Sequence, residues 1–334
     1  MDLDELNRHR RTVATADGEI AFVEVGEGPA ALFVHGVFLN AGLWRNVIEQ
    51  VCQAGHRRCV AIDLPAHGRT RVKAGQDLSL PAQADILERF CQALDLSQVD
   101  VVANDTGGAA AQVFAVRHTD RVRTLTLTNC DTHDNLPPAR FKQAVELARA
   151  GQLAPLMAPM LTDLDLARSE LALGSGYQHP DRVEDEAIRS YLEPCLGTPE
   201  AGREIERFIA SLDARDLVAV EPGLRQLEVP TLVVWGTGDV FFELSWAHWL
   251  RDTIPGVTEV VEVEGAKLFF PEERAGDLVA PLLGLWARRP PAERRDTGGR
   301  RDQRRDAGRE DLGGLGAASP SSRVVTAFPT SARA

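Results

Sequence analysis

The sequence predicts an α/β fold in which a mostly parallel sheet is covered by helices on both faces. Three observations lead to this fold class. Short apolar runs with strand character alternate with helical stretches, which is typical of β–α–β units. The runs are almost wholly apolar, as expected for strands that are buried on both faces of a sheet. One run also ends in a glycine-containing turn that opens an alanine-rich helix.

The expected strands are separated by stretches long enough to hold helices. The alanine-rich stretch from Gly107 to His118 is expected to be the helix that follows the third strand. The segment from Asp131 to about Glu221 interrupts the sheet and is helical in character. The six expected strands are residues 30–34, 58–63, 99–102, 122–127, 231–235 and 258–263.

The turn after residues 99–102 carries the clearest chemical signal in the chain. Residues 103–108 read Ala-Asn-Asp-Thr-Gly-Gly, the small-X-nucleophile-X-Gly-Gly pattern of a nucleophile elbow, with Asp105 as the nucleophile. A carboxylate is suited to displacing a leaving group from saturated carbon, whereas serine attacks carbonyl carbon. Free amides and the helix dipole at this turn favour the ionised form. Asp105 could instead simply cap the helix that begins at Gly107, but the surrounding hexamer favours a chemical role.

Five sequence markers follow one another along the chain. They are His35-Gly36, Leu43-Trp44-Arg45-Asn46, Asp63-Leu64-Pro65-Ala66-His67-Gly68, the Asp105 turn and Trp235-Gly236-Thr237-Gly238-Asp239. In this order they resemble the α/β-hydrolase superfamily. Within it, the chain is similar to the haloalkane dehalogenase and epoxide hydrolase branch, in which the nucleophile is an aspartate. The resemblance covers roughly residues 15–286 and implies an α/β-hydrolase fold with a helical cap inserted after the family's sixth strand, which corresponds to residues 122–127 here.

The resemblance and the composition together predict three parts. Residues 1–131 and 222–286 are expected to form the α/β-hydrolase core, and residues 132–221 the cap, which would exclude water and shape the pocket. Residues 287–334 are rich in Arg, Gly and Pro and have little apolar periodicity, so a disordered tail is expected there. Helices of the cap are expected at residues 138–150, 169–171, 183–192 and 201–212.

The resemblance also implies roles for residues around Asp105. The backbone amides of Val37 and Thr106 would form the oxyanion hole, and Asp239 would be the acid that orients a histidine. Some relatives place this acid at the end of the sixth strand, where Asn129 stands here, so Asp239 is the better candidate. The residues expected to line the substrate pocket are Phe38, Asn40 and Trp44, although Trp44 could equally belong to the core.

The histidine that should complete this site is missing. The family pattern places it in a turn of the Gly-X-Gly-His-Phe type after the last strand, and Leu268 occupies that position. A shift of one residue gives Lys267 or Phe269, so no alignment restores a base. Two other histidines are candidates: His133, which could reach the pocket mouth, and His248, which is expected to face solvent.

The residues that would assist a leaving group are also incomplete. Dehalogenases of this type bind the halide with a tryptophan after the nucleophile and a second donor near the His-Gly turn. Thr106 and Val37 occupy those positions here. Epoxide hydrolases use cap tyrosines to protonate the ring oxygen. The chain has two tyrosines, Tyr177 and Tyr191, both within the expected cap, so an epoxide-opening pair stays open.

These residues favour an enzyme that hydrolyses an epoxide, a halide or an ester-like bond of a small organic molecule through Asp105. Two alternatives stay open. With no histidine to activate water, Asp105 could act as a general base in a lyase, an isomerase or a cyclase. The chain could also be a catalytically degenerate protein that binds a ligand. No cofactor and no metal site are expected.

Charge and cysteine content limit the partners and the compartment. The net charge is −12, and because residues 287–334 contain 11 arginines and six acidic residues, residues 1–286 carry −17. An acidic body disfavours nucleic acid as a partner. No apolar stretch reaches the roughly 18 residues of a membrane span, and the charged start is unlike a signal peptide, so no membrane partner is expected. Five scattered cysteines indicate reduced thiols and a cytoplasmic location.

Overall fold

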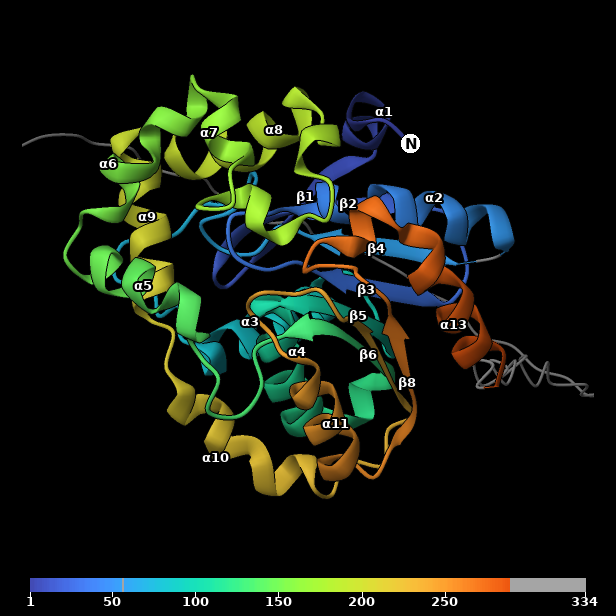
Figure 1. Cartoon of the computed structure of the whole chain (residues 1–334). Coiled ribbons are helices and arrows are strands. Elements are labelled where there is room, and N and C mark those ends of the chain that lie inside the picture. The colour runs from blue at the N-terminus through green and yellow to red at the C-terminus, as the bar shows by residue number, and fades with distance from the viewer. Residues whose placement is uncertain (56, 289–334) are drawn as a thin grey trace, which may run out of the picture. The chain divides into compact units, whose positions relative to one another are not determined.

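The computed structural model describes residues 1–55 and 57–288, and its centre is a sheet of eight strands (Figure 1). The strands are β1 (Arg10–Thr15), β2 (Gly18–Val25), β3 (Ala30–Val34), β4 (Arg58–Ile62), β5 (Val99–Asp105), β6 (Val122–Cys130), β7 (Thr231–Gly236) and β8 (Val257–Val263). They lie in the order β1-β2-β4-β3-β5-β6-β7-β8. All neighbours from β4 to β8 are parallel, whereas β2 is antiparallel to both β1 and β4. The predicted fold class, with a helical insertion after β6, is confirmed.

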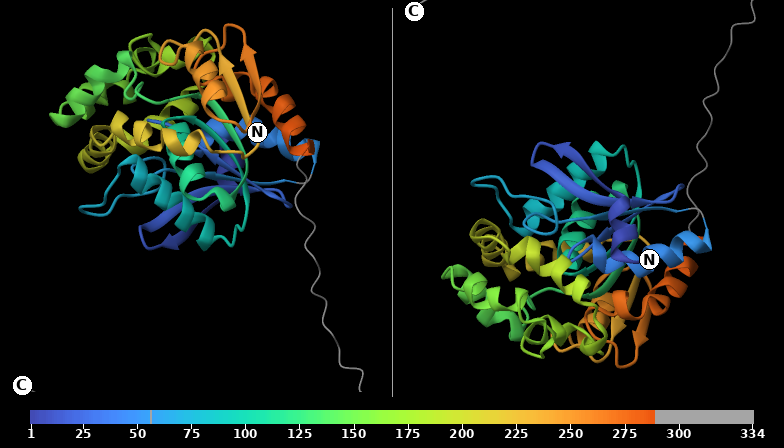
Figure 2. Two further views of the ribbon diagram at one scale, coloured as in Figure 1. Left: turned by 90° about the horizontal axis from the view of Figure 1, so that it is seen from below. Right: turned by 90° about the horizontal axis from the view of Figure 1, so that it is seen from above.

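Helices cover both faces of the sheet, which explains why its central strands are so apolar. Every residue of β3 and of β5 is buried. On one side, α2 (Arg45–Ala54) packs against α13 (Ala275–Arg288), and on the other, α3 (Leu80–Ala93) packs against α4 (Thr106–Arg117) (Figures 1 and 2). A further helix, α11 (Leu244–Thr253), packs against β7 and β8.

The first two strands form a hairpin that the sequence analysis did not predict. They pair antiparallel from Arg10 opposite Val23 to Thr15 opposite Gly18. Strand β1 lies at the edge of the sheet, and its side chains are only partly buried, so it carries no continuous apolar run. A short helix, α1 (Leu3–Arg8), precedes it.

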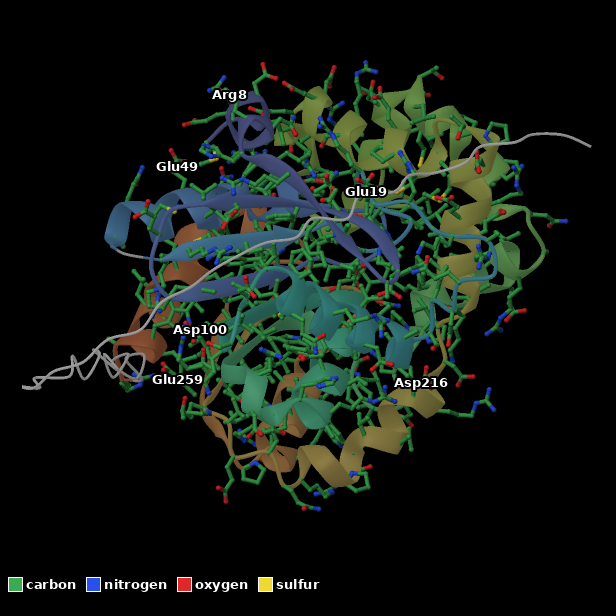
Figure 3. All side chains as sticks on the ribbon, turned by 180° about the vertical axis from the view of Figure 1, so that it is seen from behind. Arg8, Glu19, Glu49, Asp100, Asp216 and Glu259 are labelled. Carbon is green, nitrogen blue, oxygen red and sulfur yellow. The ribbon has the colours of Figure 1, made fainter. Side chains whose placement is uncertain are left out.

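Charged side chains lie over the surface of the molecule, and Asp100 is a buried exception (Figure 3). Arg8 and Glu259 are exposed. Asp100 on β5 accepts hydrogen bonds from Nε of Arg123 at 2.9 Å and from Oγ1 of Thr124 at 2.8 Å, both on β6. These bonds fix the alignment of the two strands that carry the candidate site.

The insertion between β6 and β7 is helical, as predicted. Its first helices are α5 (Lys142–Arg149), α6 (Leu153–Met157), α7 (Leu164–Arg168), α8 (Asp185–Leu196) and α9 (Pro199–Ala210). Three of them, α5, α6 and α8, pack against α9. The start of α9 is set by Thr198, whose hydroxyl accepts a hydrogen bond from the amide of Ala201 at 3.1 Å, and by Pro199 in its first turn.

Two details differ from the expected helix positions. Residues 169–171 form a bend and a turn rather than a helix, because the nearby helix α7 ends at Arg168. This helix begins after Asp163, whose side chain accepts a hydrogen bond from the amide of Leu166 at 3.0 Å. The last helix of the insertion, α10 (Ala214–Leu224), packs against α4 of the core. The expected cap boundary at residue 221 therefore falls inside a helix that covers the core.

The expected tail lies almost wholly outside the described residues. Residues 287 and 288 form the last turn of α13, and residues 289–334 are not described. Within residues 1–55 and 57–288, no helix is long and apolar enough to cross a membrane. The same part of the chain has no cluster of three or more side chains able to hold a metal ion.

Candidate active site

Asp105 lies on a strained turn where β5 passes directly into α4. Its φ of 57° and ψ of −137° fall in a region that residues with side chains rarely adopt. The following glycines make the turn possible, because a side chain on Gly107 would overlap the carbonyl oxygen of His35, and one on Gly108 would overlap Cys130. The turn is thus packed tightly against the segments that follow β3 and end β6.

The backbone amides expected to form the oxyanion hole face the carboxyl group of Asp105 itself. The N–H of Val37 donates to Oδ2 at 2.9 Å, and the absence of a side chain on Gly36 leaves room for this contact. Burial raises the pKa of Asp105 to about 7. The amides of Val37 and Thr106 oppose this rise, and the charge of Asp239 adds to it. Asp105 therefore changes its protonation state near neutral pH.

A second buried carboxyl group, Asp131, lies beside this turn and was not anticipated from the sequence. Cys130 pairs with Asp105 in the sheet, so the next residue emerges from β6 at the same edge. The hydroxyl of Thr106 donates to Oδ2 of Asp131 at 3.0 Å, while Oδ1 is buried without a partner among the described residues. Burial and the charge of Asp105 raise the pKa of Asp131 well above its usual value. The sequence signal that could have identified Asp131 is its position, two residues after Asn129, which stands where some relatives place the orienting acid.

Asn129 and Asp239, the two alternative positions for an orienting acid, are hydrogen-bonded to each other. Nδ2 of Asn129 donates to Oδ2 of Asp239 at 2.7 Å, and the amide of Phe241 donates to Oδ1 at 2.8 Å. Oδ1 of Asn129 accepts from the amide of Gly236 at 2.7 Å, which fixes the orientation of the pair. Burial raises the pKa of Asp239 to about 6, and these donors oppose the rise. Asp239 does not line the cavity described next.

Asp105, Thr106 and Asp131 line a cavity of about 430 Å³ between the sheet and the helical insertion. Its walls are largely apolar, and its volume suits a small organic molecule. Two lining leucines, Leu156 and Leu171, are 62% and 91% exposed and mark its mouth. Other apolar lining residues include Leu136, Phe141, Met160, Leu192, Phe242 and Leu268.

The structure places one of the three expected pocket residues in the cavity wall. Phe38 lines the cavity. Asn40 does not, and its Nδ2 donates instead to the carbonyl oxygen of Ser190, on α8 of the helical insertion, at 2.7 Å. Trp44 is fully buried and packs against Phe33 in the core. Asn40 therefore links the loop after β3 to the helical insertion, and Trp44 belongs to the hydrophobic core.

Comparison with known proteins identifies the family. The family described as alpha/beta hydrolase fold matches residues 29–273. A haloalkane dehalogenase from Agrobacterium fabrum is 32% identical over 287 residues, which cover 81% of this chain and 89% of that protein. This chain belongs to the α/β-hydrolase family.

Solved structures of other proteins have the fold of this α/β-hydrolase. The haloalkane dehalogenase DatA from Agrobacterium tumefaciens is 23% identical, with a TM-score of 0.70 over 84% of this chain and 97% of the other. The epoxide hydrolase CorEH is 19% identical, with a TM-score of 0.69 over 84% of this chain and 98% of the other. At these sequence identities, the similarity shows a shared fold and nothing about activity.

Leu268 of this α/β-hydrolase stands at the position expected for the histidine. Its side chain lines the cavity, and its carbonyl oxygen accepts a hydrogen bond from Nδ2 of Asn104 at 3.0 Å. The next residue, Phe269, donates its amide hydrogen to the carbonyl oxygen of Gly176, in the helical insertion, at 2.8 Å. On the other side, Lys267 forms an ion pair with Glu170 at 3.0 Å. The loop is therefore held in place but contributes no imidazole.

No histidine in the described part of this α/β-hydrolase lines the cavity. A ring nitrogen of His133 lies 2.9 Å from the carboxylate of Glu221, and the ring packs against Trp249. His248 lies 3.4 Å from Glu262, and its side chain is 40% exposed. Neither histidine supplies a base at the cavity.

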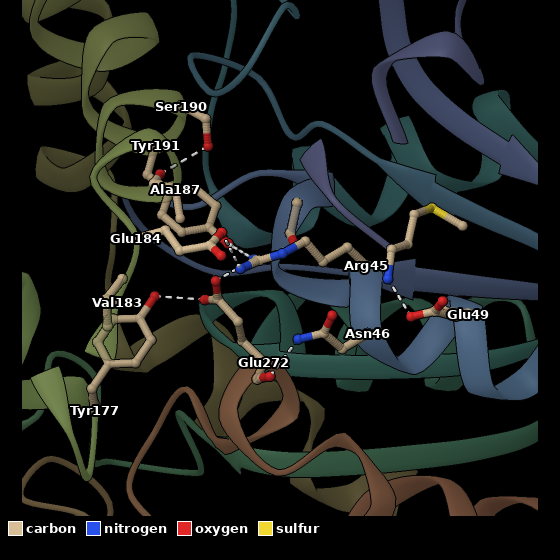
Figure 4. A network of polar contacts seen from close by, with 12 residues as sticks. Arg45, Asn46, Glu49, Tyr177, Val183, Glu184, Ala187, Ser190, Tyr191 and Glu272 are labelled. Atoms are coloured by element: carbon tan, nitrogen blue, oxygen red, sulfur yellow. Dashed lines mark hydrogen bonds and ion pairs between the residues drawn. The ribbon is translucent and has the colours of Figure 1, made fainter. Parts of the chain in front are cut away.

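The two tyrosines belong to a buried network that links the helical insertion to Arg45 and Glu272 (Figure 4), and they do not line the cavity. The hydroxyl of Tyr177 donates to Oε2 of Glu272, on the short helix α12 (Phe270–Glu273), at 2.6 Å. Arg45 forms an ion pair with the same carboxylate and lies 3.4 Å from the hydroxyl of Tyr191. The epoxide-opening tyrosine pair left open by the sequence is therefore wrong for this cavity.

Proposed function

We propose that this α/β-hydrolase hydrolyses a small apolar molecule through an ester formed on Asp105. The observation that carries the proposal is the position of the Asp105 carboxyl group, on a strained turn, at the wall of an apolar cavity and 2.9 Å from the amide of Val37. Helices that close over such a cavity exclude water from a charged nucleophile. The dehalogenase relative, at 32% identity, supports a substrate with a leaving group on carbon.

The ester mechanism has two steps. An oxygen of Asp105 attacks a saturated carbon, the bond from that carbon to its leaving atom breaks, and an alkyl ester forms. Water then attacks the carbonyl carbon of the ester, the alcohol leaves, and the carboxyl group is restored. The amides of Val37 and Thr106 face this carbonyl group and would stabilise the negative oxygen that forms when water adds.

An oxygen leaving group suits this cavity better than a halide. Thr106 stands where dehalogenases of this type have a halide-binding tryptophan, and its hydroxyl already donates to Asp131. Val37 offers its backbone amide, which is bonded to Asp105. The substrate class that fits these residues best is therefore an epoxide, whose ring oxygen must receive a proton as the ring opens.

A second candidate function follows from the protonation of Asp105. Its pKa of about 7 is near the value that suits a general base at neutral pH. Asp105 could then remove a proton from carbon in an elimination, an isomerisation or a cyclisation. Such a lyase, isomerase or cyclase would need neither an ester nor a histidine.

Isotope labelling separates these functions. In a single turnover of 1,2-epoxyhexane in H₂¹⁸O, the ester mechanism should place ¹⁸O in the carboxyl group of Asp105, which peptide mass spectrometry locates. A general-base mechanism forms product and leaves Asp105 unlabelled, and a binding protein gives neither product nor label. The Asp105→Asn variant should give neither product nor ¹⁸O label at residue 105. The Asp134→Asn variant, which changes an exposed carboxylate, serves as the matched control.

A further inference from the structure

We propose that Asp131 is a second catalytic residue, which protonates the leaving oxygen and then takes a proton from the attacking water. The inference rests on the proposed function of Asp105. It assigns to one carboxyl group two tasks for which the cavity has neither a histidine nor a tyrosine among its described lining residues.

The geometry holds Asp131 firmly and leaves one of its oxygens free. Nε2 of Gln112 donates to its backbone carbonyl oxygen at 2.8 Å, and the hydroxyl of Thr106 donates to Oδ2 at 3.0 Å. Oδ1 has no hydrogen-bond partner in the described structure, although the residue is only 1% exposed. A buried oxygen without a partner is costly unless it has a role. Asp131 and Asp105 line the same cavity, so both residues border the space that a substrate would fill.

The charges around Asp131 favour a shared proton. The nearby ionisable groups that act on it are the carboxyl groups of Asp105 and Asp239, and no described cation forms an ion pair with it. Two neighbouring buried carboxyl groups rarely ionise together. Burial, and then the charge of Asp105, raise the pKa of Asp131 well above its usual value, which favours the protonated form of Asp131 beside an ionised Asp105. The other charged residues on the cavity wall are Arg140 and Glu170, both exposed.

The first step consumes this proton. An oxygen of the ionised Asp105 attacks one carbon of the epoxide, the bond between that carbon and the ring oxygen breaks, and the proton of Asp131 passes to the ring oxygen. The products are a hydroxyalkyl ester on Asp105 and an ionised Asp131. No further reactant is needed.

The second step restores the proton. The Asp131 carboxylate takes a proton from water as the water oxygen attacks the carbonyl carbon of the ester. The tetrahedral species then releases the alcohol oxygen, which takes the proton of the added hydroxyl group, and the Asp105 carboxylate reforms. The diol leaves, and Asp131 is protonated again. One residue thus acts first as an acid and then as a base, with balanced atoms and charge.

Two reagents with the same carbon skeleton test this role. With 1,2-epoxyhexane, Asp131→Asn should lower the rate of ester formation by about 10²- to 10⁴-fold, because the ring oxygen receives no proton. With 1-bromohexane, whose bromide leaves without a proton, the ester should form on Asp105 at close to the wild-type rate. That ester should then accumulate, because the variant has no base to activate water. In the unaltered protein, the ester removes the charge of Asp105 that helps to raise the pKa of Asp131, so Asp131 can lose its proton to solvent and act as the base. Intact-protein mass spectrometry follows both reactions, with Asp134→Asn as the control.

A pH profile of the unaltered protein tests the same role without a variant. Ester formation from the epoxide should decline as the pH rises through the pKa of Asp131, whereas ester formation from the bromide should not decline. An Asp131→Asn protein that opens the epoxide and releases the ester at wild-type rates would overturn the inference. So would equal losses with both reagents in the variant, together with identical pH profiles. If the unaltered protein forms no ester and no diol with either reagent, the proposed function fails first, and this inference fails with it.

Discussion

Asn129 donates a hydrogen bond of 2.7 Å to Asp239, the residue that the sequence predicts to be the acid that orients a histidine. The loop that would carry that imidazole is fixed, because Asn104 donates to the carbonyl oxygen of Leu268 at 3.0 Å. Leu268 also lines the cavity. Leu268 therefore stands, in a hydrogen-bonded loop, at the position where the sequence pattern predicts a histidine.

Leu268→His should speed the release of an ester from Asp105, because Asp239 lies in the position expected to orient the new ring. The effect should be clearest in an Asp131→Asn background loaded with 1-bromohexane, where the release of the adduct should quicken by about 10²- to 10⁴-fold. Leu268→Phe adds a ring without a nitrogen and should give no gain. An unchanged release rate would mean that the bond from Asn129 keeps Asp239 from a new partner.

Asp105→Asn should abolish turnover and leave the fold intact, because the amide has nearly the same shape but cannot act as a nucleophile or a base. Slow deamidation of the asparagine would restore aspartate, so Asp105→Ala should be assayed beside it. Circular dichroism checks the fold of both proteins. Activity within a few-fold of the unaltered protein would remove Asp105 from the mechanism.

The buried carboxyl group of Asp105 should make the protein less stable as the pH rises from about 4 to about 7. Its pKa is about 7 in the folded protein against an ordinary value of 3.8, so over this range the unfolded chain releases a proton that the folded protein keeps. The shift corresponds to roughly 4 kcal/mol. Urea unfolding of the unaltered protein and of Asp105→Asn should give free energies that diverge by up to this amount. A constant difference across the range would contradict the raised pKa.

The Arg45–Glu272–Tyr177 network should contribute to stability more than to chemistry, because it lies outside the cavity. Glu272→Ala leaves the buried Arg45 without its main partner and should lower the free energy of unfolding by about 3–5 kcal/mol. Tyr177→Phe removes one hydrogen bond and should lower it by about 1–3 kcal/mol. Urea titration measures both losses. A large fall in single-turnover rate in folded Tyr177→Phe would link the network to the reaction after all.

The helical insertion should set what binds, because most of the cavity wall belongs to it. Replacing residues 132–212 with the corresponding segment of a relative should change the preferred epoxide while the sheet still folds. The exchange stops before α10, because that helix packs against α4. If the exchanged protein kept the substrate preference of the unaltered protein, the insertion would not be what selects the substrate.

Local sequence was sufficient to predict the central strands and the turn that holds Asp105. Strands buried on both faces appear as short apolar runs, and β3, β4 and β7 lie within one residue of their predicted ranges. The hairpin of β1 and β2 was missed because an edge strand is only partly buried and carries no such run. Asp105 was found because its turn needs Gly107 and Gly108 at fixed positions in the chain.

The rest of the site depends on contacts between distant segments. Asp131 lies beside Asp105 only because β5 pairs with β6, and spacing along the chain does not reveal that pairing. The same limit applies to Trp44 and to Tyr177. Their local sequence contains an aromatic ring but does not say whether it will face the cavity, the core or a buried ion pair.

The exposed Leu156 and Leu171 keep apolar surface in water at the cavity mouth. A short ligand would stay near Asp105 and leave that surface wet, whereas a longer one would cover both leucines. Burying apolar surface on binding lowers the heat capacity. The heat-capacity change should therefore become more negative with ligand chain length until the chain passes the two leucines, and level off beyond them. Calorimetry on a series of alkyl chains would thus measure the depth of the cavity from Asp105 to its mouth.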